Sequence, residues 1–169
     1  MATAFDDEEF PLAYFISYRC YGTWLHGDSR GSVDRKNNVY GTPKLPVNKN
    51  LENSEARLLK HPPFKLNATC RKAVDDAVRE VCSHRHYLLR ALNVRTNHVH
   101  SVVSARKKPE PILNAFQAYS TRKLRERGLL ALDVKPWSRH GSTIYLWSDE
   151  DVFKAIEYVM SGQGGDFEL

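Results

Sequence analysis

The amino-acid sequence predicts an α+β protein with the β-α-β-β-α-β order of a ferredoxin-like sandwich, an antiparallel sheet and one added C-terminal helix. Apolar residues recur at helical spacing in two segments that begin near residues 68 and 109, while four short segments rich in aromatic and β-branched residues resemble strands. The 169 residues, 41% hydrophobic and 27% charged, suffice for one domain, which we expect to span residues 1–169.

The first half of the chain holds a strand, a long connection and a helix. Residues 12–20 are aromatic and apolar and predict the first strand. A long basic loop insertion over 26–66 follows, with one short helix at 53–60, and connections of this length are usually functional or mobile. Asn67 is a suitable N-cap for a helix over 68–83.

The second half alternates strands and helices. Residues 87–95 and 98–105 predict two strands, and a helix then runs from Pro109 or Pro111 to Gly128. Residues 142–147 predict the fourth strand. Ser148 and Asp151 form a capping-box pattern at the start of a last helix, which ends near Ser161 and leaves a short tail, 162–169. We expect helices on one face of the sheet and an open second face for a ligand or a second subunit.

The charge balance favours a polyanionic partner. The chain has 25 Lys and Arg against 20 Asp and Glu, a net charge of +5. We expect backbone phosphates to contact the basic loop and the basic helix, at Arg30, Arg35, Lys36, Arg122 and Lys123. Four aromatic residues are candidates for stacking on unpaired bases: Tyr21, Trp24, Tyr40 and Trp137.

Several classes of protein are excluded by simple features. No apolar run approaches the roughly 20 residues of a membrane helix, and the acidic N-terminus is unlike a signal peptide. Cys20, Cys70 and Cys82 have no disulfide-framework or metal-site spacing and are interpreted as structural. We therefore expect a soluble cytoplasmic protein without a membrane partner.

The sharpest local motif is Asn97-His98-Val99-His100 at the start of a predicted strand. Side chains alternate along a strand, so His98 and His100 share one face, about 7 Å apart at a rise near 3.4 Å per residue. Two imidazoles in this position can turn toward one divalent metal ion. Paired histidines in a strand are more often ordinary surface or packing residues, so the motif alone does not establish a metal site.

A tyrosine in the last helix provides a second candidate. Val152, Phe153, Ile156, Val159 and Met160 form the predicted apolar stripe. Tyr158 lies roughly 160° from its centre at 100° per residue, so we expect this side chain on the opposite side of the helix, as a solvated residue or as a nucleophile. The competing tyrosine, Tyr119, has core spacing with Ile112 and Phe116 and is interpreted as packing.

These features together resemble the single-tyrosine HUH transposases of bacterial insertion sequences and their REP-associated relatives. The resemblance covers most of residues 11–163 and rests on the order and spacing of four features. These are the opening strand 15–19, the His-hydrophobe-His triplet 98–100, the helical segment Ser-Thr-Arg-Lys-Leu-Arg at 120–125, and Tyr158 in a terminal helix. The family has a ferredoxin-like core, in agreement with the predicted order of elements.

The resemblance implies a DNA transposase or endonuclease that cleaves and rejoins single-stranded DNA at hairpin-flanked sites through a covalent 5′-phosphotyrosine. It implies that His98 and His100 bind Mg²⁺ or Mn²⁺. The family often has an amide ligand four residues after the tyrosine, where this chain has Gly162, and we expect the next residue, Gln163, to serve. Helical spacing separately makes Lys154 a candidate cation for activating Tyr158.

Two alternatives remain open from the sequence. One is a domesticated relative that processes REP-type hairpins without moving an element. The other is a catalytically inactive module that binds single-stranded DNA or RNA. Insertion-sequence members commonly act as dimers and the REP-associated relatives can act alone, so a homodimer is one of two expectations. The resemblance also implies a bacterial, nucleoid-associated location.

Overall fold

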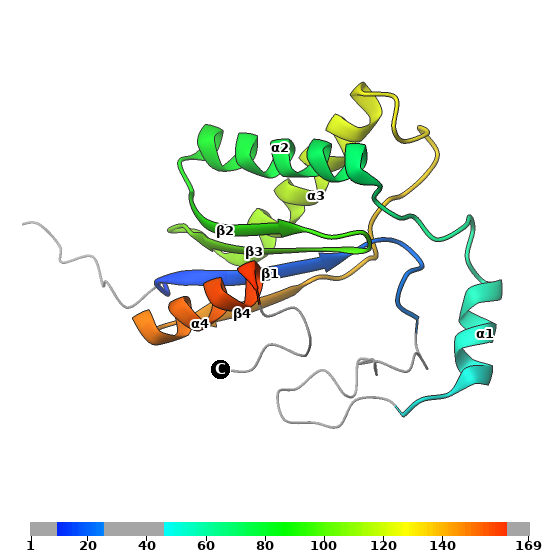
Figure 1. Cartoon of the computed structure of the whole chain (residues 1–169), viewed down its shortest axis with the longest axis horizontal. Coiled ribbons are helices and arrows are strands. Elements are labelled where there is room, and N and C mark those ends of the chain that lie inside the picture. The colour runs from blue at the N-terminus through cyan, green and yellow to red at the C-terminus, as the bar shows by residue number, and fades with distance from the viewer. Residues whose placement is uncertain (1–9, 26–45, 162–169) are drawn as a thin grey trace, which may run out of the picture.

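The computed structural model describes residues 10–25 and 46–161 of the chain. These residues form four strands and four helices (Figure 1). Their order and bounds are β1 Ala13–Arg19, α1 Lys49–Arg57, α2 Ala68–Arg85, β2 Leu88–Val94, β3 His98–Ser104, α3 Pro109–Glu126, β4 Ser142–Leu146 and α4 Asp149–Met160. No helix in these two ranges is long and apolar enough to cross a membrane.

The four strands form one sheet in the order β2-β3-β1-β4, and every neighbouring pair is antiparallel. β1 is central, with Phe15 opposite both Val102 of β3 and Ile144 of β4. This topology confirms the predicted ferredoxin-like sandwich with an antiparallel sheet and an added C-terminal helix.

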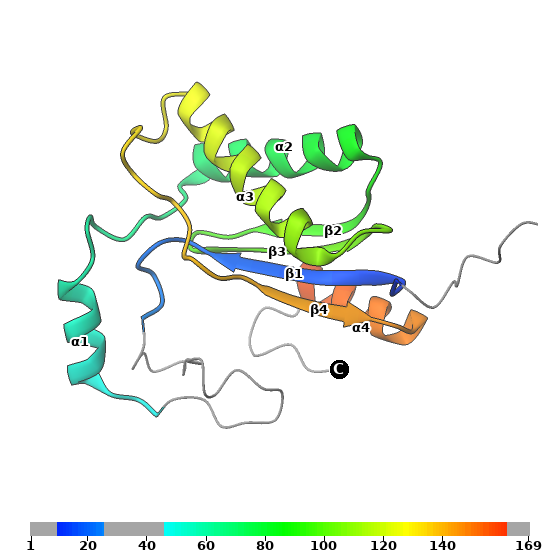
Figure 2. The ribbon, with the colours of Figure 1, turned by 180° about the vertical axis from the view of Figure 1, so that it is seen from behind.

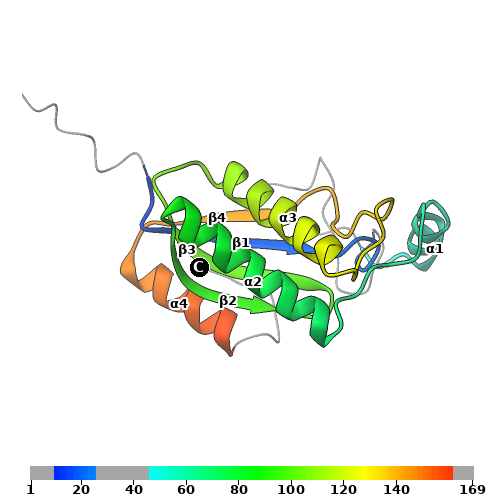
Figure 3. The same ribbon diagram turned by 90° about the horizontal axis from the view of Figure 1, so that it is seen from above.

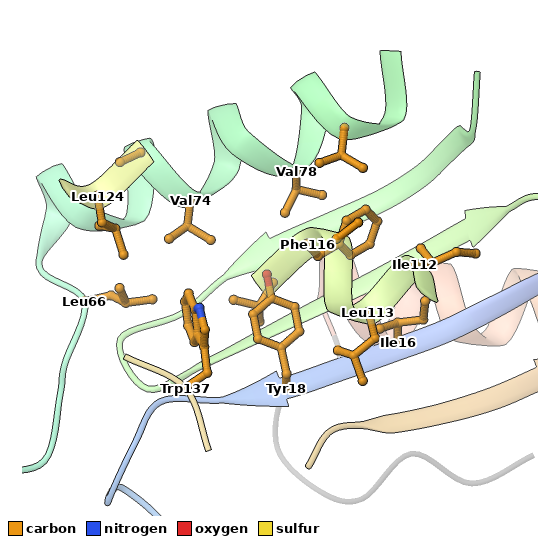
Figure 4. Packing of buried hydrophobic residues seen from close by; sticks show 14 of the residues in the cluster. Ile16, Tyr18, Leu66, Val74, Val78, Ile112, Leu113, Phe116, Leu124 and Trp137 are labelled. Atoms are coloured by element: carbon orange, nitrogen blue, oxygen red, sulfur yellow. The ribbon is translucent and has the colours of Figure 1, made fainter. Parts of the chain in front are cut away.

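Helices α2 and α3 cover the first face of the sheet and enclose the larger core (Figures 2 and 4). Val74 and Val78 of α2 and Ile112 and Phe116 of α3 are fully buried above the sheet. Alternation along β1 presents the core residues Tyr14, Ile16 and Tyr18 to this face. The apolar spacing that predicted these two helices therefore marks their buried sides.

Helix α4 covers part of the second face (Figure 1). Its Val152, Ala155 and Val159 pack against a core of Ala13, Phe15, Ala91, Val102 and Leu146 from the strands. The prediction that this face is open was therefore wrong. The added helix buries the apolar side chains that alternation directs away from α2 and α3.

The local start signals act as the sequence predicted. The Asn67 side chain accepts a hydrogen bond from the Cys70 N–H at the start of α2. Ser148 and Asp151 form a reciprocal capping box, and only two residues, Trp147 and Ser148, separate the end of β4 from the start of α4. This short connection turns the chain directly onto the second face and returns α4 along the sheet (Figure 3).

Candidate functional site

His98 and His100 begin β3 on the face of the sheet that α4 covers. Their cross-strand partners on β1 are Arg19 and Ser17, respectively. The two imidazole rings lie with their centroids 4.5 Å apart. The predicted pairing of the two histidines on one face is therefore present in the structure.

The two imidazoles have different surroundings. His98 Nδ1 lies 2.6 Å from the amide oxygen of Asn97, an acceptor that places the hydrogen on Nδ1 and leaves the Nε2 lone pair available. The His100 ring stacks on Phe15 at 5.3 Å between centroids. Its Nδ1 is buried and has no hydrogen-bond partner among the described residues. Such an orphaned polar atom requires an explanation, and a bound group is one.

His100 is held in its neutral form. Burial, together with the smaller effects of the positive charges of His98, Arg19 and Arg95, lowers its pKa from 6.5 to about 3. Only a neutral imidazole has a lone pair for a metal ion. Both histidines therefore fit a divalent cation, although the described residues hold no cluster of three His, Cys, Asp or Glu side chains.

Tyr158, on α4, lies beside the histidine pair. Its ring centroid lies 5.6 Å from that of His100 and 5.8 Å from that of Phe15, in edge-to-face arrangements. The expectation that Tyr158 lies opposite the packed side of α4 was wrong. The buried residues of α4 are Val152, Ala155 and Val159, so its inward side is rotated by about 65° from the predicted stripe and Tyr158 flanks it.

The cause of this rotation is the size of the residues that face the sheet. Ala155 is fully buried, whereas Phe153 and Met160 are 61% and 64% exposed. A small side chain lets the helix backbone approach the sheet closely. Large hydrophobic side chains can remain exposed to solvent, because much of the surface of a folded protein is apolar. Summing hydrophobicity around the helix therefore gives the wrong direction.

Asn93 of β2 ties α4 to the sheet next to the tyrosine. It is the cross-strand partner of His100, and its side-chain N–H donates to the Val159 carbonyl oxygen at 2.9 Å. One side chain thus links the strand beside His100 to the residue after Tyr158. The sequence analysis missed Asn93, since an isolated asparagine in a strand carries no motif.

The remaining catalytic candidates are less closely associated with this group. The Lys154 ammonium is exposed and lies 2.9 Å from the carboxylate of Glu150. Glu150 is one helical turn N-terminal to Lys154, whereas Tyr158 is one turn C-terminal to it. That carboxylate raises the pKa of Lys154, so the amine stays charged but paired. Gln163 lies outside the described residues.

The predicted DNA contacts lie elsewhere or are not described. Arg122 and Lys123 of α3 both pair with Glu80 of α2, on the first face of the sheet. Arg122 also lies over the ring of Tyr119, which packs against the core as expected. The loop positions fall outside the described residues: Arg30, Arg35, Lys36 and Tyr40.

The stacking candidates among the described residues already contact other side chains or the backbone of the chain. Trp137 is buried, and its indole N–H donates to the Gln117 carbonyl, so the expectation that it stacks on bases was wrong. The Tyr21 ring lies 4.1 Å from that of His61. The Arg19 guanidinium lies 3.3 Å from the centre of the Trp24 ring.

Comparisons with known proteins concern the family and the fold of the chain. The family model described as "Transposase IS200 like" matches residues 60–149, more than half of the chain. A REP-associated tyrosine transposase solved bound to a REP hairpin has a similar fold, with a TM-score of 0.52, 11% identity, and coverage of 94% of this chain and 70% of that one. A candidate transposase from Deinococcus radiodurans R1 has a TM-score of 0.51 at 12% identity, covering 97% and 99%. No curated protein matches the chain.

Replacing Asn93 should loosen the end of α4. We expect Asn93→Ala to lower the free energy of unfolding by about 1 kcal/mol, because the Val159 carbonyl loses its side-chain donor. Amide hydrogen exchange should accelerate in the last turn of α4. Asn93→Asp, which cannot donate and places a negative charge beside the carbonyl, should destabilise at least as much as Asn93→Ala, whereas Asn53→Ala, at an exposed position of α1, is the control. Unchanged exchange in both Asn93 variants would show that packing alone holds α4.

The neutral state of His100 predicts a pH dependence of stability in the metal-free protein. The pKa of His100 is about 3 in the folded chain and about 6.5 in the unfolded chain, so the unfolded chain binds the proton first. The contribution of His100 to the free energy of unfolding is fully present above pH 6.5 and is lost as the pH drops toward 3. Denaturation at several pH values should show a smaller loss for His100→Gln, and a His100 ring titrating near pH 6.5 by NMR would contradict the assignment.

Proposed function

Because the chain belongs to the family of IS200-like transposases, we propose that it cleaves and rejoins single-stranded DNA with Tyr158 as its nucleophile. The observation that carries the proposal is the contact between Tyr158 on α4 and His100 on β3. These residues are far apart in the chain, and the packing of α4 on the second face brings them together. A phenol beside two histidines on rigid elements has the components for attack on a phosphodiester.

The proposed step exchanges one ester bond for another. The Tyr158 oxygen attacks the phosphorus, its proton leaves, and the new bond to phosphorus forms as the bond to the 3′ oxygen breaks. The departing 3′ oxygen takes up a proton, and the 5′ phosphate stays on the tyrosine. Attack by a 3′ hydroxyl reverses the exchange and rejoins a strand, so neither direction needs a nucleotide cofactor.

His98 and His100 are the residues that would hold Mg²⁺ or Mn²⁺. When bound, such an ion supplies Lewis-acid polarisation of the phosphate oxygens. The protein's own contribution is to orient both imidazoles, His98 through Asn97 and His100 through its stacking on Phe15, and to keep His100 neutral through burial. Gln163 as a further ligand and Lys154 as an activating cation stay predictions.

The proposed substrate is a DNA hairpin with single-stranded flanks. The fold likeness to a REP-associated transposase bound to a REP hairpin supports this choice. The positive net charge of the chain is consistent with a polyanionic partner. The proposed chemistry is compatible with a monomer and with a homodimer.

Tyr158→Phe tests the nucleophile. Incubated with labelled single-stranded hairpins from the DNA flanking the gene and with Mn²⁺, the wild type should form an adduct that survives denaturing electrophoresis. Tyr158→Phe should form none while binding the hairpin as before, because it loses only the reacting oxygen. Tyr119→Phe is the matched control and should react normally. An adduct in Tyr158→Phe but not in Tyr119→Phe would reverse the assignment of the two tyrosines.

Metal binding by the histidine pair can be measured without DNA. Calorimetric titration with Mn²⁺ should give an affinity that falls roughly tenfold or more in His98→Ala and in His100→Ala. His84→Ala, an exposed histidine in the last turn of α2, should bind as the wild type does. Equal Mn²⁺ affinity in all four proteins, or adduct formation in EDTA, would remove the metal from the proposal.

A further inference from the structure

Four segments that are distant in the sequence meet at the end of the sheet where β3 begins. The Ser138 N–H donates to the Arg19 carbonyl, the Cys20 N–H to that of Asn97, and the Leu66 N–H to that of Thr96. These backbone bonds join residues 17–25, 58–66, 93–100 and 134–142 around His98 and His100.

The charges on these segments are of one sign. They carry six exposed basic residues and no Asp or Glu; we call the six the basic end: Arg19, Lys60, Lys65, Arg95, Lys135 and Arg139. Two of them, Arg19 and Arg95, are close enough to His100 for their charges to lower its pKa. Arg19 and Arg95 therefore lie near the histidine pair, and backbone bonds hold the segments of the other four residues at the same end of the sheet.

Several basic residues of the α2–α3 layer are neutralised by carboxylates. On the first face, Arg122 and Lys123 pair with Glu80, and Arg127 pairs with Asp76. Within the described ranges no such ion pair involves Arg95, Lys135, Arg139 or the two lysines of the basic end. An exposed cation without a carboxylate partner can bind a phosphate and release counterions, whereas a paired one must first lose its partner.

Resting on the proposed function, we infer that the basic end is the surface that binds the DNA phosphates on either side of the cleaved one. Arg19 is oriented for this role by the Trp24 ring beneath its guanidinium, and its backbone pairs with that of His98. A strand bound here passes the histidines and the Tyr158 ring. The first face, with α2 and α3, contributes little to binding.

The test compares charge removal at the two ends of the sheet in a Tyr158→Phe background, so that no cleavage occurs. Arg95→Gln/Arg139→Gln removes two charges of the basic end. Lys107→Gln/Lys108→Gln removes two exposed charges beyond the last residue of β3, at the opposite end. Binding of a fluorescent single-stranded oligonucleotide is followed by anisotropy at several salt concentrations, and thermal melting verifies that each variant folds.

We expect the Arg95/Arg139 variant to bind roughly tenfold more weakly and its log–log salt slope to shrink by about 1.4, at about 0.7 per lost phosphate contact on a single strand. The Lys107/Lys108 variant should match its parent. An equal or larger loss in the lysine variant, or no loss in the arginine variant, would overturn the inference. A larger loss in Arg122→Gln/Lys123→Gln would move the DNA to α3.

The outcome is separable from that of the proposed function. Adduct formation with wild type but an unaltered salt slope in Arg95→Gln/Arg139→Gln rejects the surface and keeps the chemistry. A reduced salt slope in Arg95→Gln/Arg139→Gln, with no covalent adduct in the wild type, supports the basic end as the DNA-binding surface and rejects the proposed cleavage by Tyr158.

Discussion

The packing of α4 on the second face of the sheet is the constraint on which the whole site depends. Phe15 and Val102 supply the apolar surface, and Ala155 lets the helix approach it closely. The same Phe15 ring contacts both His100 and Tyr158. A single aromatic residue of the central strand therefore joins the core to the two groups that the proposed chemistry needs.

Charge is distributed between the two faces in a way that net charge conceals. The α2–α3 layer uses its basic residues for ion pairs within the protein, including those with Asp76 and Glu80. These pairs hold the pKa of both carboxyl groups below their usual values, so both carboxylates stay ionised and paired at neutral pH. Near the histidines, the four segments of the basic end carry six positive charges and no negative one.

The sequence predicted the fold well because its signals are local. Apolar spacing in 68–83, the caps at Asn67 and Ser148 and the alternation around His98 each depend on neighbouring residues. The side of α4 that faces the sheet was mispredicted, since the size of Ala155 mattered more than the hydrophobicity of Phe153. Asn93 and the pairing of Arg122 with Glu80 depend on contacts between distant segments, which no pattern in a single sequence encodes.

The two-residue connection of Trp147 and Ser148 makes the length of α4 a geometric determinant of the site. The helix begins where β4 ends and returns along the sheet, rising about 14 Å between Asp149 and Tyr158. One residue inserted before the tyrosine would advance it by about 1.5 Å and turn it by about 100°, away from His100. Length changes should therefore accumulate in the long connection after β1, where they leave this distance untouched, and be excluded from the first nine positions of α4.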